Sequence, residues 1–169
     1  MSQVTFQGEP VAISGSFVQA GSQLPSFTLT SSTLEEIKWS DLCGTKLVIN
    51  VFPSIDTPVC AASVRRFNKE ASHLENVVVL CISADLPFAA NRFCAIEGLK
   101  NVRTASFFRS PLFTEHFGVK ISEGPLEGLS ARAILIVDEE GLVTYSELVS
   151  EITNEPNYTA ALDALNALS

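Results

Sequence analysis

The sequence predicts an α/β fold in which helices flank a central mixed β-sheet and a β-hairpin lies at the N-terminus. In the first half of the chain, β-type apolar runs alternate with stretches whose apolar residues recur at helical spacing, as in parallel βαβ units. In the second half, two further β-type runs surround a turn, as in an antiparallel pair. The chain has 169 residues, of which 46% are apolar and 18% charged, and this fits a single domain over residues 1–169.

The first predicted elements are short strands. Residues 4–6 and 11–13 flank a turn at Gly8-Glu9-Pro10 and indicate a hairpin. Residues 27–30 resemble another short strand. Residues 46–52 form a nearly continuous apolar run that ends before Pro53, which is typical of a strand buried on both faces. We expect this run to be the central strand.

A helix is predicted after the loop at residues 53–58, with Thr57 as its N-cap and Pro58 as its first residue. Its apolar or small residues recur at helical spacing: Val59, Ser63, Phe67, Ala71 and Leu74. Residues 76–83 then predict a second buried strand, and a shorter helix runs from Pro87 to about Glu97, closed by Gly98. This order predicts a parallel βαβ core with a right-handed crossover.

The second half of the chain is less regular, with a Gly-rich loop at residues 122–129. Its predicted strands and helices are residues 103–106, 112–117 (a helix stopped by Gly118), 131–137, 142–148 and the amphipathic helix 158–168. The two strands around the turn at residues 138–141 form an antiparallel hairpin. A parallel βαβ unit followed by a hairpin and a helix is a thioredoxin-like order.

Charge and hydropathy exclude several classes of partner. The net charge is −8, and no basic cluster is longer than Arg65-Arg66, so a surface that follows nucleic-acid phosphates is not expected. The first ten residues lack the basic and apolar regions of a secretory signal, and no apolar run approaches the ~18 residues that span a bilayer. We therefore expect a cytoplasmic protein that binds neither nucleic acid nor membrane.

The four cysteines are Cys43, Cys60, Cys81 and Cys94. In a chain of this length without a secretory signal they need not form a disulfide framework, so reduced thiols with a redox or packing role are expected. The chain has no Cys-x-x-Cys pair, and its only histidines are His73 and His116, so a metal site is not expected.

Cys60 has the best position for a nucleophile. It lies in the first turn of the predicted helix, where unpaired backbone N–H groups and the positive end of the helix dipole favour an anion such as a thiolate. Free cysteine is also among the most buried residue types and often packs as a small apolar residue. Its position alone favours a reactive thiolate and a packed apolar thiol equally.

The residues around Cys60 carry a family resemblance. Pro53, Thr57 and Cys60 match the peroxiredoxin pattern of Pro, three residues, Thr, two residues, Cys. Together with residues 48–68, 80–88 and 92–94, the chain is similar over essentially its full length to the bacterial thiol peroxidases. The resemblance implies a homodimeric thioredoxin-fold peroxidase recycled by thioredoxin. It makes Cys60 the peroxidatic cysteine, Cys94 the resolving cysteine and Arg132 an active-site arginine.

Each implied role has a physical basis. The Thr57 hydroxyl can accept a hydrogen bond from a helix N–H or bind the peroxide, and Pro53 can shape the loop and exclude water. Arg132 offers a permanently charged fork that could stabilise the thiolate and the leaving oxygen, although an exposed ion pair is the common alternative for an arginine.

The resemblance implies a reaction that needs no metal, flavin or haem. The Cys60 thiolate attacks the peroxide and becomes a sulfenic acid, which condenses with Cys94 to a disulfide that a dithiol reductant opens. Because the two cysteines lie on different predicted helices, we expect local unwinding before they join. A thiol-disulfide oxidoreductase is disfavoured by the missing Cys-x-x-Cys, and a redox sensor using the same Cys60–Cys94 switch stays open.

The remaining candidates have weaker signals. Cys81 interrupts a buried strand and is interpreted as core packing, and Cys43 has no catalytic context. His73 and His116 lie near helix ends and suit solvated capping. Asp85 and Phe88 are expected to line the pocket or a dimer interface. Apolar residues near the loop, namely Phe52, Val59 and Phe88, favour alkyl hydroperoxides alongside hydrogen peroxide as substrates.

Overall fold

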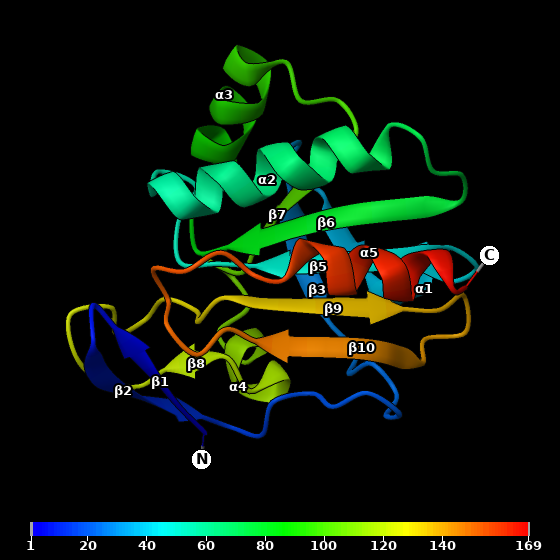
Figure 1. Ribbon diagram of the computed structural model, residues 1–169. Helices are drawn as coiled ribbons and strands as arrows, with labels where there is room; N and C mark the ends of the chain where they lie inside the picture. Colours follow the sequence, from blue (N-terminus) through cyan, green and yellow to red (C-terminus); the bar gives the residue numbers. More distant parts are fainter. Residues whose placement is uncertain (1, 169) are drawn as a thin grey trace.

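The computed structural model describes residues 2–168 (Figure 1). Its strands are β1 (Ser2–Phe6), β2 (Glu9–Ser14), β3 (Thr28–Ser31), β4 (Glu36–Lys38), β5 (Lys46–Val51), β6 (Val77–Ser83), β7 (Arg103–Ser106), β8 (Lys120–Ile121), β9 (Ala133–Val137) and β10 (Val143–Leu148). Its helices are α1 (Trp39–Leu42), α2 (Pro58–Ala71), α3 (Pro87–Glu97), α4 (Phe113–Phe117) and α5 (Tyr158–Asn166).

A seven-stranded mixed sheet forms the centre of the molecule, with the order β10-β9-β5-β6-β7-β3-β4. Strand β5 pairs in parallel with β6, and β6 in parallel with β7, while β9 runs antiparallel to β5. The predicted mixed sheet and its parallel βαβ units are therefore confirmed. Strand β5 is an interior strand between β9 and β6, although the middle strand of the seven is β6. Sequence reasoning missed only short pieces: β4, α1 and β8.

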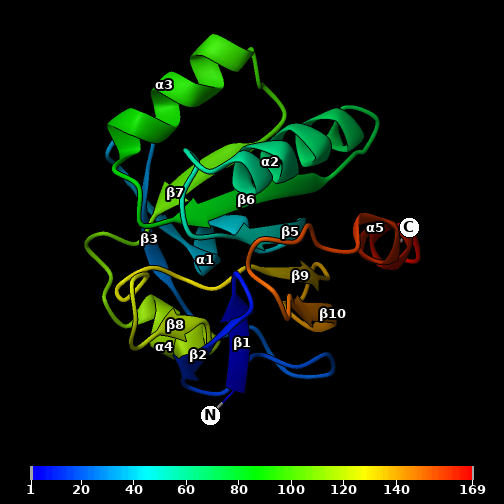
Figure 2. The same ribbon diagram turned by 60° about the vertical axis from the view of Figure 1, so that its left-hand side comes forward.

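The alternation of side chains along the strands separates two apolar clusters on the two faces of the sheet. Within β5, Leu47, Ile49 and Val51 belong to one cluster and Val48 to the other. The second cluster also holds the apolar faces of α2, α3 and α5. The first holds α4 and the N-terminal hairpin, which lie on the opposite side of the sheet from α2 and α5 (Figure 2). Cys60 belongs to the helical cluster, at 0% exposure.

The predicted N-terminal hairpin is present, but its turn was predicted too late in the chain, because Glu9 and Pro10 both belong to β2. Strands β1 and β2 pair through Phe6↔Glu9, so the turn residues are Gln7 and Gly8, and Pro10 lies inside β2 opposite Thr5. Both turn residues have positive φ, 53° and 83°, as the tight turns that match strand twist require. The proline at position 10 pointed to a turn, but β2 accepts it because position 10 has no need to donate a ladder hydrogen bond.

The helix starts agree with the sequence pattern, although α2 ends at Ala71, three residues before Leu74, the last residue of its predicted pattern. Helix α2 has Thr57 as N-cap and Pro58 as its first residue, and α3 ends at Gly98, whose φ of 68° fits a left-handed helix end. Among residues 2–168, no helix is both long enough and apolar enough to cross a membrane.

Candidate active site

Helix α2 places Cys60 in its first turn, at the third helical position. The backbone N–H groups of this turn have no partner earlier in the helix, so they and the helix dipole favour negative charge at this point. The sulfur is withdrawn from solvent, because Cys60 is 0% exposed. The Ser63 hydroxyl donates to the Cys60 carbonyl oxygen at 2.8 Å and fastens the turn behind the sulfur.

Arg132 is the cation that faces this sulfur. Its side chain is 2% exposed, and its Nη2 donates to Cys60 Sγ at 3.2 Å. Its Nε donates to the Ile152 carbonyl oxygen at 2.9 Å, while Nη1 has no partner among the described residues. An exposed ion pair, the alternative considered from sequence, is therefore wrong. The Nη2 of the guanidinium therefore donates to the sulfur, and Nη1 can donate to a substrate oxygen.

Strand pairing explains why Arg132 reaches a residue 72 positions away. Val51, the last residue of β5, pairs with Ala133 at the start of β9. The chain then leaves β5 into the loop that leads to α2, so the residue just before Ala133 lies beside that loop. The Ser130 hydroxyl donates to the Phe52 carbonyl oxygen at 3.0 Å and ties the two segments together.

Thr57 and Pro53 both lie beside Arg132, but the Thr57 hydroxyl does not cap the helix. Thr57 is the N-cap residue by backbone conformation, yet its side chain accepts no helix N–H. The hydroxyl instead donates at 2.9 Å to the Ser54 carbonyl oxygen, which also accepts from the Thr57 N–H at 3.2 Å. Its acceptor lone pairs are left for a substrate O–H. Pro53 is buried and forms part of the pocket wall.

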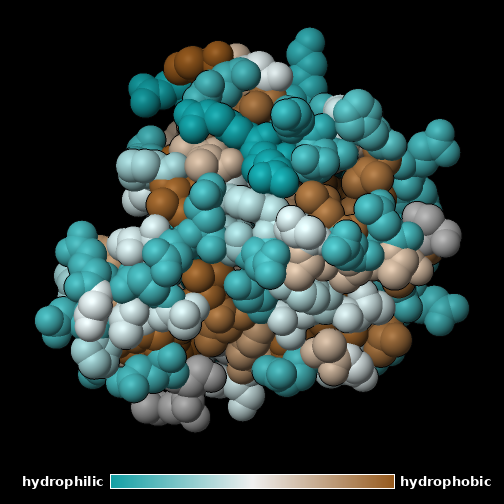
Figure 3. Space-filling view, in the orientation of Figure 1, coloured by the Kyte–Doolittle hydropathy of each residue, from teal (hydrophilic) through white to brown (hydrophobic). Residues whose placement is uncertain are grey.

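A small pocket of about 250 Å³ opens over these residues. Its walls are mainly apolar, and they come from the α2 loop, the N-terminal hairpin, the Gly-rich loop and the segment after β10: Phe6, Gln7, Pro53, Thr57, Pro58, Val59, Leu126, Arg132, Ile152 and Thr153. In the space-filling view the outline is notched at the left, between α2 above and the hairpin below, and apolar residues in brown gather beside the notch (Figure 3).

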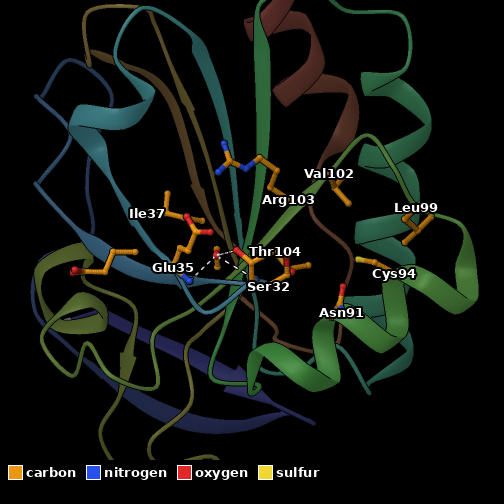
Figure 4. A pocket seen from close by; sticks show the side chains of 12 residues that line it. Ser32, Glu35, Ile37, Asn91, Cys94, Leu99, Val102, Arg103 and Thr104 are labelled. Carbon is orange, nitrogen blue, oxygen red and sulfur yellow. Dashed lines mark hydrogen bonds between the residues drawn. The ribbon is translucent and has the colours of Figure 1, made fainter.

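Cys94 is not brought into this pocket. It lies on α3, is half-buried, and lines a separate cleft of about 390 Å³ that shares no lining residue with the pocket above Arg132. In Figure 4 its sulfur points from α3 into that cleft, toward Thr104 on β7. Both Cys60 and Cys94 are free thiols, and burial raises the pKa of the Cys94 thiol.

A family model described as Redoxin matches residues 19–162. A thiol peroxidase from Vibrio cholerae serotype O1 is 53% identical over 162 residues, which cover 96% of this chain and 99% of the relative. The chain belongs to the thiol peroxidase family. A thiol peroxidase from Corynebacterium glutamicum is 52% identical over 166 residues, covering 98% of this chain and all of the relative. A solved peroxiredoxin-like protein from Aquifex aeolicus superposes with a TM-score of 0.92 at 38% identity, covering 100% of this chain and 98% of the other.

Membership of the thiol peroxidase family confirms two expectations from the sequence. The chain is an enzyme whose family activity is peroxide reduction, and its fold is the thioredoxin-like fold of peroxiredoxins. The geometry adds which side chains of this thiol peroxidase meet: Cys60, Arg132, Thr57 and Pro53 converge, and Cys94 stands apart.

Asp85 holds the loop that carries these residues, a role that sequence reasoning did not specify. Its carboxylate accepts from the Ser54 hydroxyl at 2.8 Å, the Ile55 N–H at 2.7 Å and the Ser83 hydroxyl at 2.7 Å. It lies just past the end of β6, the strand beside β5, so it meets the loop that follows β5. The sequence placed Asp85 near the pocket or an interface, and the structure makes it the anchor of the pocket loop.

A contact between α2 and α3 joins the helices of the two cysteines. Arg65 of α2 donates to the Glu97 carboxylate through Nε at 3.0 Å and also through Nη2. The Arg65 guanidinium also lies 5.7 Å from the ring centroid of Phe93 on α3. We call this contact the α2–α3 latch.

The other singled-out residues lie away from the pocket. Cys81 is 1% exposed in the core, as expected, and burial raises its pKa to about 12, while a hydrogen bond from Asn50 acts against that rise. Cys43 is exposed, and so are both histidines. Phe88 is 67% exposed and does not line the pocket, because it points outward from the first turn of α3. Of residues 2–168, no group of three or more His, Cys, Asp or Glu could hold a metal ion.

Proposed function

We propose that this chain reduces hydrogen peroxide and alkyl hydroperoxides by attack of the Cys60 sulfur on the peroxide. The observation that carries the proposal is the 3.2 Å contact between Arg132 Nη2 and Cys60 Sγ in the first turn of α2. A buried guanidinium and a helix N-terminus act together on one sulfur, and both favour the thiolate, which is the nucleophile.

In the first step the Cys60 thiolate attacks one peroxide oxygen in line with the O–O bond. An S–O bond forms, the O–O bond breaks, and the leaving oxygen takes up a proton and departs as water or an alcohol. Cys60 is thereby oxidised to a sulfenic acid and the peroxide is reduced. The free Nη1 of Arg132 supports this step, since it can donate to the leaving oxygen as negative charge develops there.

In the second step the Cys94 thiol attacks the sulfenic sulfur, which releases water and leaves a Cys60–Cys94 disulfide. The Cys60 sulfur is buried against Arg132, whereas Cys94 lines a cleft that neither Cys60 nor Arg132 lines, so we propose that the start of α2 and part of α3 unwind locally before the bond forms. A dithiol reductant, thioredoxin, then opens the disulfide by two thiol exchanges and becomes oxidised itself. Dependence on a reducing thiol pool fits a cytoplasmic location.

The pocket walls support alkyl hydroperoxides as substrates beside hydrogen peroxide. Val59, Leu126 and Ile152 surround Arg132 with apolar surface, and a volume of about 250 Å³ has room for a small organic group next to the reacting oxygens.

We also propose a homodimer. Four large apolar side chains are 44–67% exposed on the segments that follow β6 and β7, which are neighbouring parallel strands: Leu86, Phe88, Phe108 and Leu112. Exposed apolar side chains from adjacent loops favour a contact with another chain. Sedimentation of the wild type and of Phe88→Glu tests this: a dimer that dissociates in the variant supports it, and a wild-type monomer at micromolar concentration contradicts it.

The test of the catalytic proposal is peroxide consumption coupled to thioredoxin and its reductase. Cys60→Ser is expected to abolish turnover, and turnover that persists would contradict the assignment. Cys94→Ser is expected to retain one rapid oxidation per chain and to lose thioredoxin-supported turnover, whereas full turnover would indicate another resolving thiol. Cys43→Ser is the matched control, because this exposed thiol is expected to leave the rate unchanged.

A further inference from the structure

Glu151 accepts more hydrogen bonds than a surface carboxylate usually does. Its Oε1 accepts from the Thr5 hydroxyl at 2.9 Å and the Gly8 N–H at 2.8 Å. Its Oε2 accepts from the Gln7 N–H at 3.2 Å, the Thr153 N–H at 2.8 Å and the Thr153 hydroxyl at 2.7 Å. Five donors on one carboxylate join the segment after β10 to the tip of the N-terminal hairpin.

Two of these donors belong to a turn that needs support. Gln7 has a φ of 53°, in the left-handed region that few residues other than glycine, asparagine and aspartate adopt. The carboxylate binds the N–H groups of both turn residues, Gln7 and Gly8, and so stabilises this conformation. The donors from Thr153 and Gly8 hold the pKa of Glu151 at about 2, well below the ordinary carboxyl value, so the acceptor is ionised near neutral pH.

The supported hairpin tip forms one side of the peroxide pocket. Phe6 and Gln7 line the pocket from the hairpin, and Ile152 and Thr153 line it from the segment beside Glu151. We infer that Glu151 is a positioning residue that clamps the hairpin tip over the pocket and thereby sets the preference for organic over hydrogen peroxide. This inference rests on the proposed function, in which Arg132 lines that pocket and acts together with Cys60.

The position of Arg132 does not depend on the hydrogen bonds of the Glu151 side chain. The segment that carries the Ile152 carbonyl, the acceptor for Arg132 Nε, is also held to β1 by backbone bonds: Thr5 N–H to the Ser150 oxygen and Ile152 N–H to the Thr5 oxygen, each at 2.8 Å. These bonds do not involve the Glu151 side chain. Loss of the carboxylate therefore releases the tip at Gln7 and leaves Arg132 in place.

The experiment compares kcat/KM for cumene hydroperoxide and hydrogen peroxide in Glu151→Gln. The amide puts an N–H₂ group where N–H donors now converge, so the tip is expected to detach. We expect the value for cumene hydroperoxide to fall about tenfold, mainly through KM, because one apolar wall is lost. The value for hydrogen peroxide should change less than about threefold, since this substrate is too small to use that wall. Equal changes for the two substrates, or none, would overturn the inference.

Two further variants complete the design. Glu9→Gln removes the same charge from an exposed position on the same hairpin and is expected to leave both substrates unaffected. Thr5→Val removes one donor to the carboxylate and should give a smaller, equally selective loss, which keeps the inference testable if Glu151→Gln does not fold. Cys60→Ser is run alongside: turnover there contradicts the proposed function, whereas an unselective Glu151→Gln with inactive Cys60→Ser contradicts only the clamp.

Discussion

Replacing Arg132 with methionine tests the site most directly. Methionine is unbranched, shorter and uncharged, so it fills part of the same buried space with an apolar side chain and leaves no buried cation. A hydrogen bond from a charged donor, such as the one to Cys60 Sγ, is worth about 1.5–3 kcal/mol. A preorganised donor to the leaving oxygen is worth about 2.7–4 kcal/mol. The larger contribution alone sets the minimum loss, because about 2.7 kcal/mol corresponds to ~100-fold in rate.

The assay is a stopped-flow measurement of the oxidation of reduced protein by hydrogen peroxide, in the absence of any reductant. We expect the second-order rate constant of Arg132→Met to fall by at least ~100-fold, and by up to ~10⁵-fold if both contributions add. Arg66→Met is the control, because Arg66 lies on the same helix as Cys60 but has an exposed side chain that contacts Glu70 and the ring of Tyr158. A loss below about tenfold in a folded Arg132→Met protein would refute the role assigned to the guanidinium.

Three further predictions concern the later steps and the fold. Because burial raises the pKa of the Cys94 thiol, disulfide formation should accelerate as pH rises from 7 toward 9, and a flat stopped-flow profile would contradict this. Breaking the α2–α3 latch by Arg65→Met or Glu97→Gln should speed disulfide formation by about 1.5- to 5-fold, since a solvent-exposed ion pair is worth only about 0.2–1 kcal/mol, and 0.5 M salt should erase the difference. The pKa of Glu151 in the folded protein, about 2, lies below its ordinary value of 4.5, so the stabilisation by its carboxylate is present above pH 4.5 and is lost as pH falls toward 2. In acid denaturation, Glu151→Gln should reduce the dependence of the free energy of unfolding on pH in this range, while Glu9→Gln should not.

The sequence predicted the parts of the fold that local patterns encode. The apolar run of β5 and the Thr57-Pro58 start of α2 depend on neighbouring residues only, and both agree with the structure. The turn at Gln7 was placed wrongly because its left-handed conformation is supported from Glu151, far along the chain, and no local signal reports that support. The short strand β4 has too few residues for a periodic pattern.

The candidate site also contains residues that local sequence patterns predict and residues that only the fold brings together. Cys60, Thr57 and Pro53 lie within eight positions and carry a motif, so sequence reasoning brought them together. Arg132 was found through the family resemblance, and only strand pairing between β5 and β9 explains its contact with the sulfur. The pocket walls Phe6 and Leu126 went unnoticed, since single apolar residues in a hairpin and a loop have no pattern of their own.

The separation of the buried Cys60 sulfur from the cleft that Cys94 lines has a consequence for how the enzyme would respond to peroxide dose. In the proposed cycle a Cys60 sulfenic acid must wait while the start of α2 and part of α3 rearrange. During that interval a second peroxide molecule competes with Cys94, and its success yields a sulfinic acid that thiols do not reduce. The rate at which the helices unwind therefore sets the peroxide concentration above which Cys60 is oxidised to the sulfinic acid faster than it forms the disulfide with Cys94.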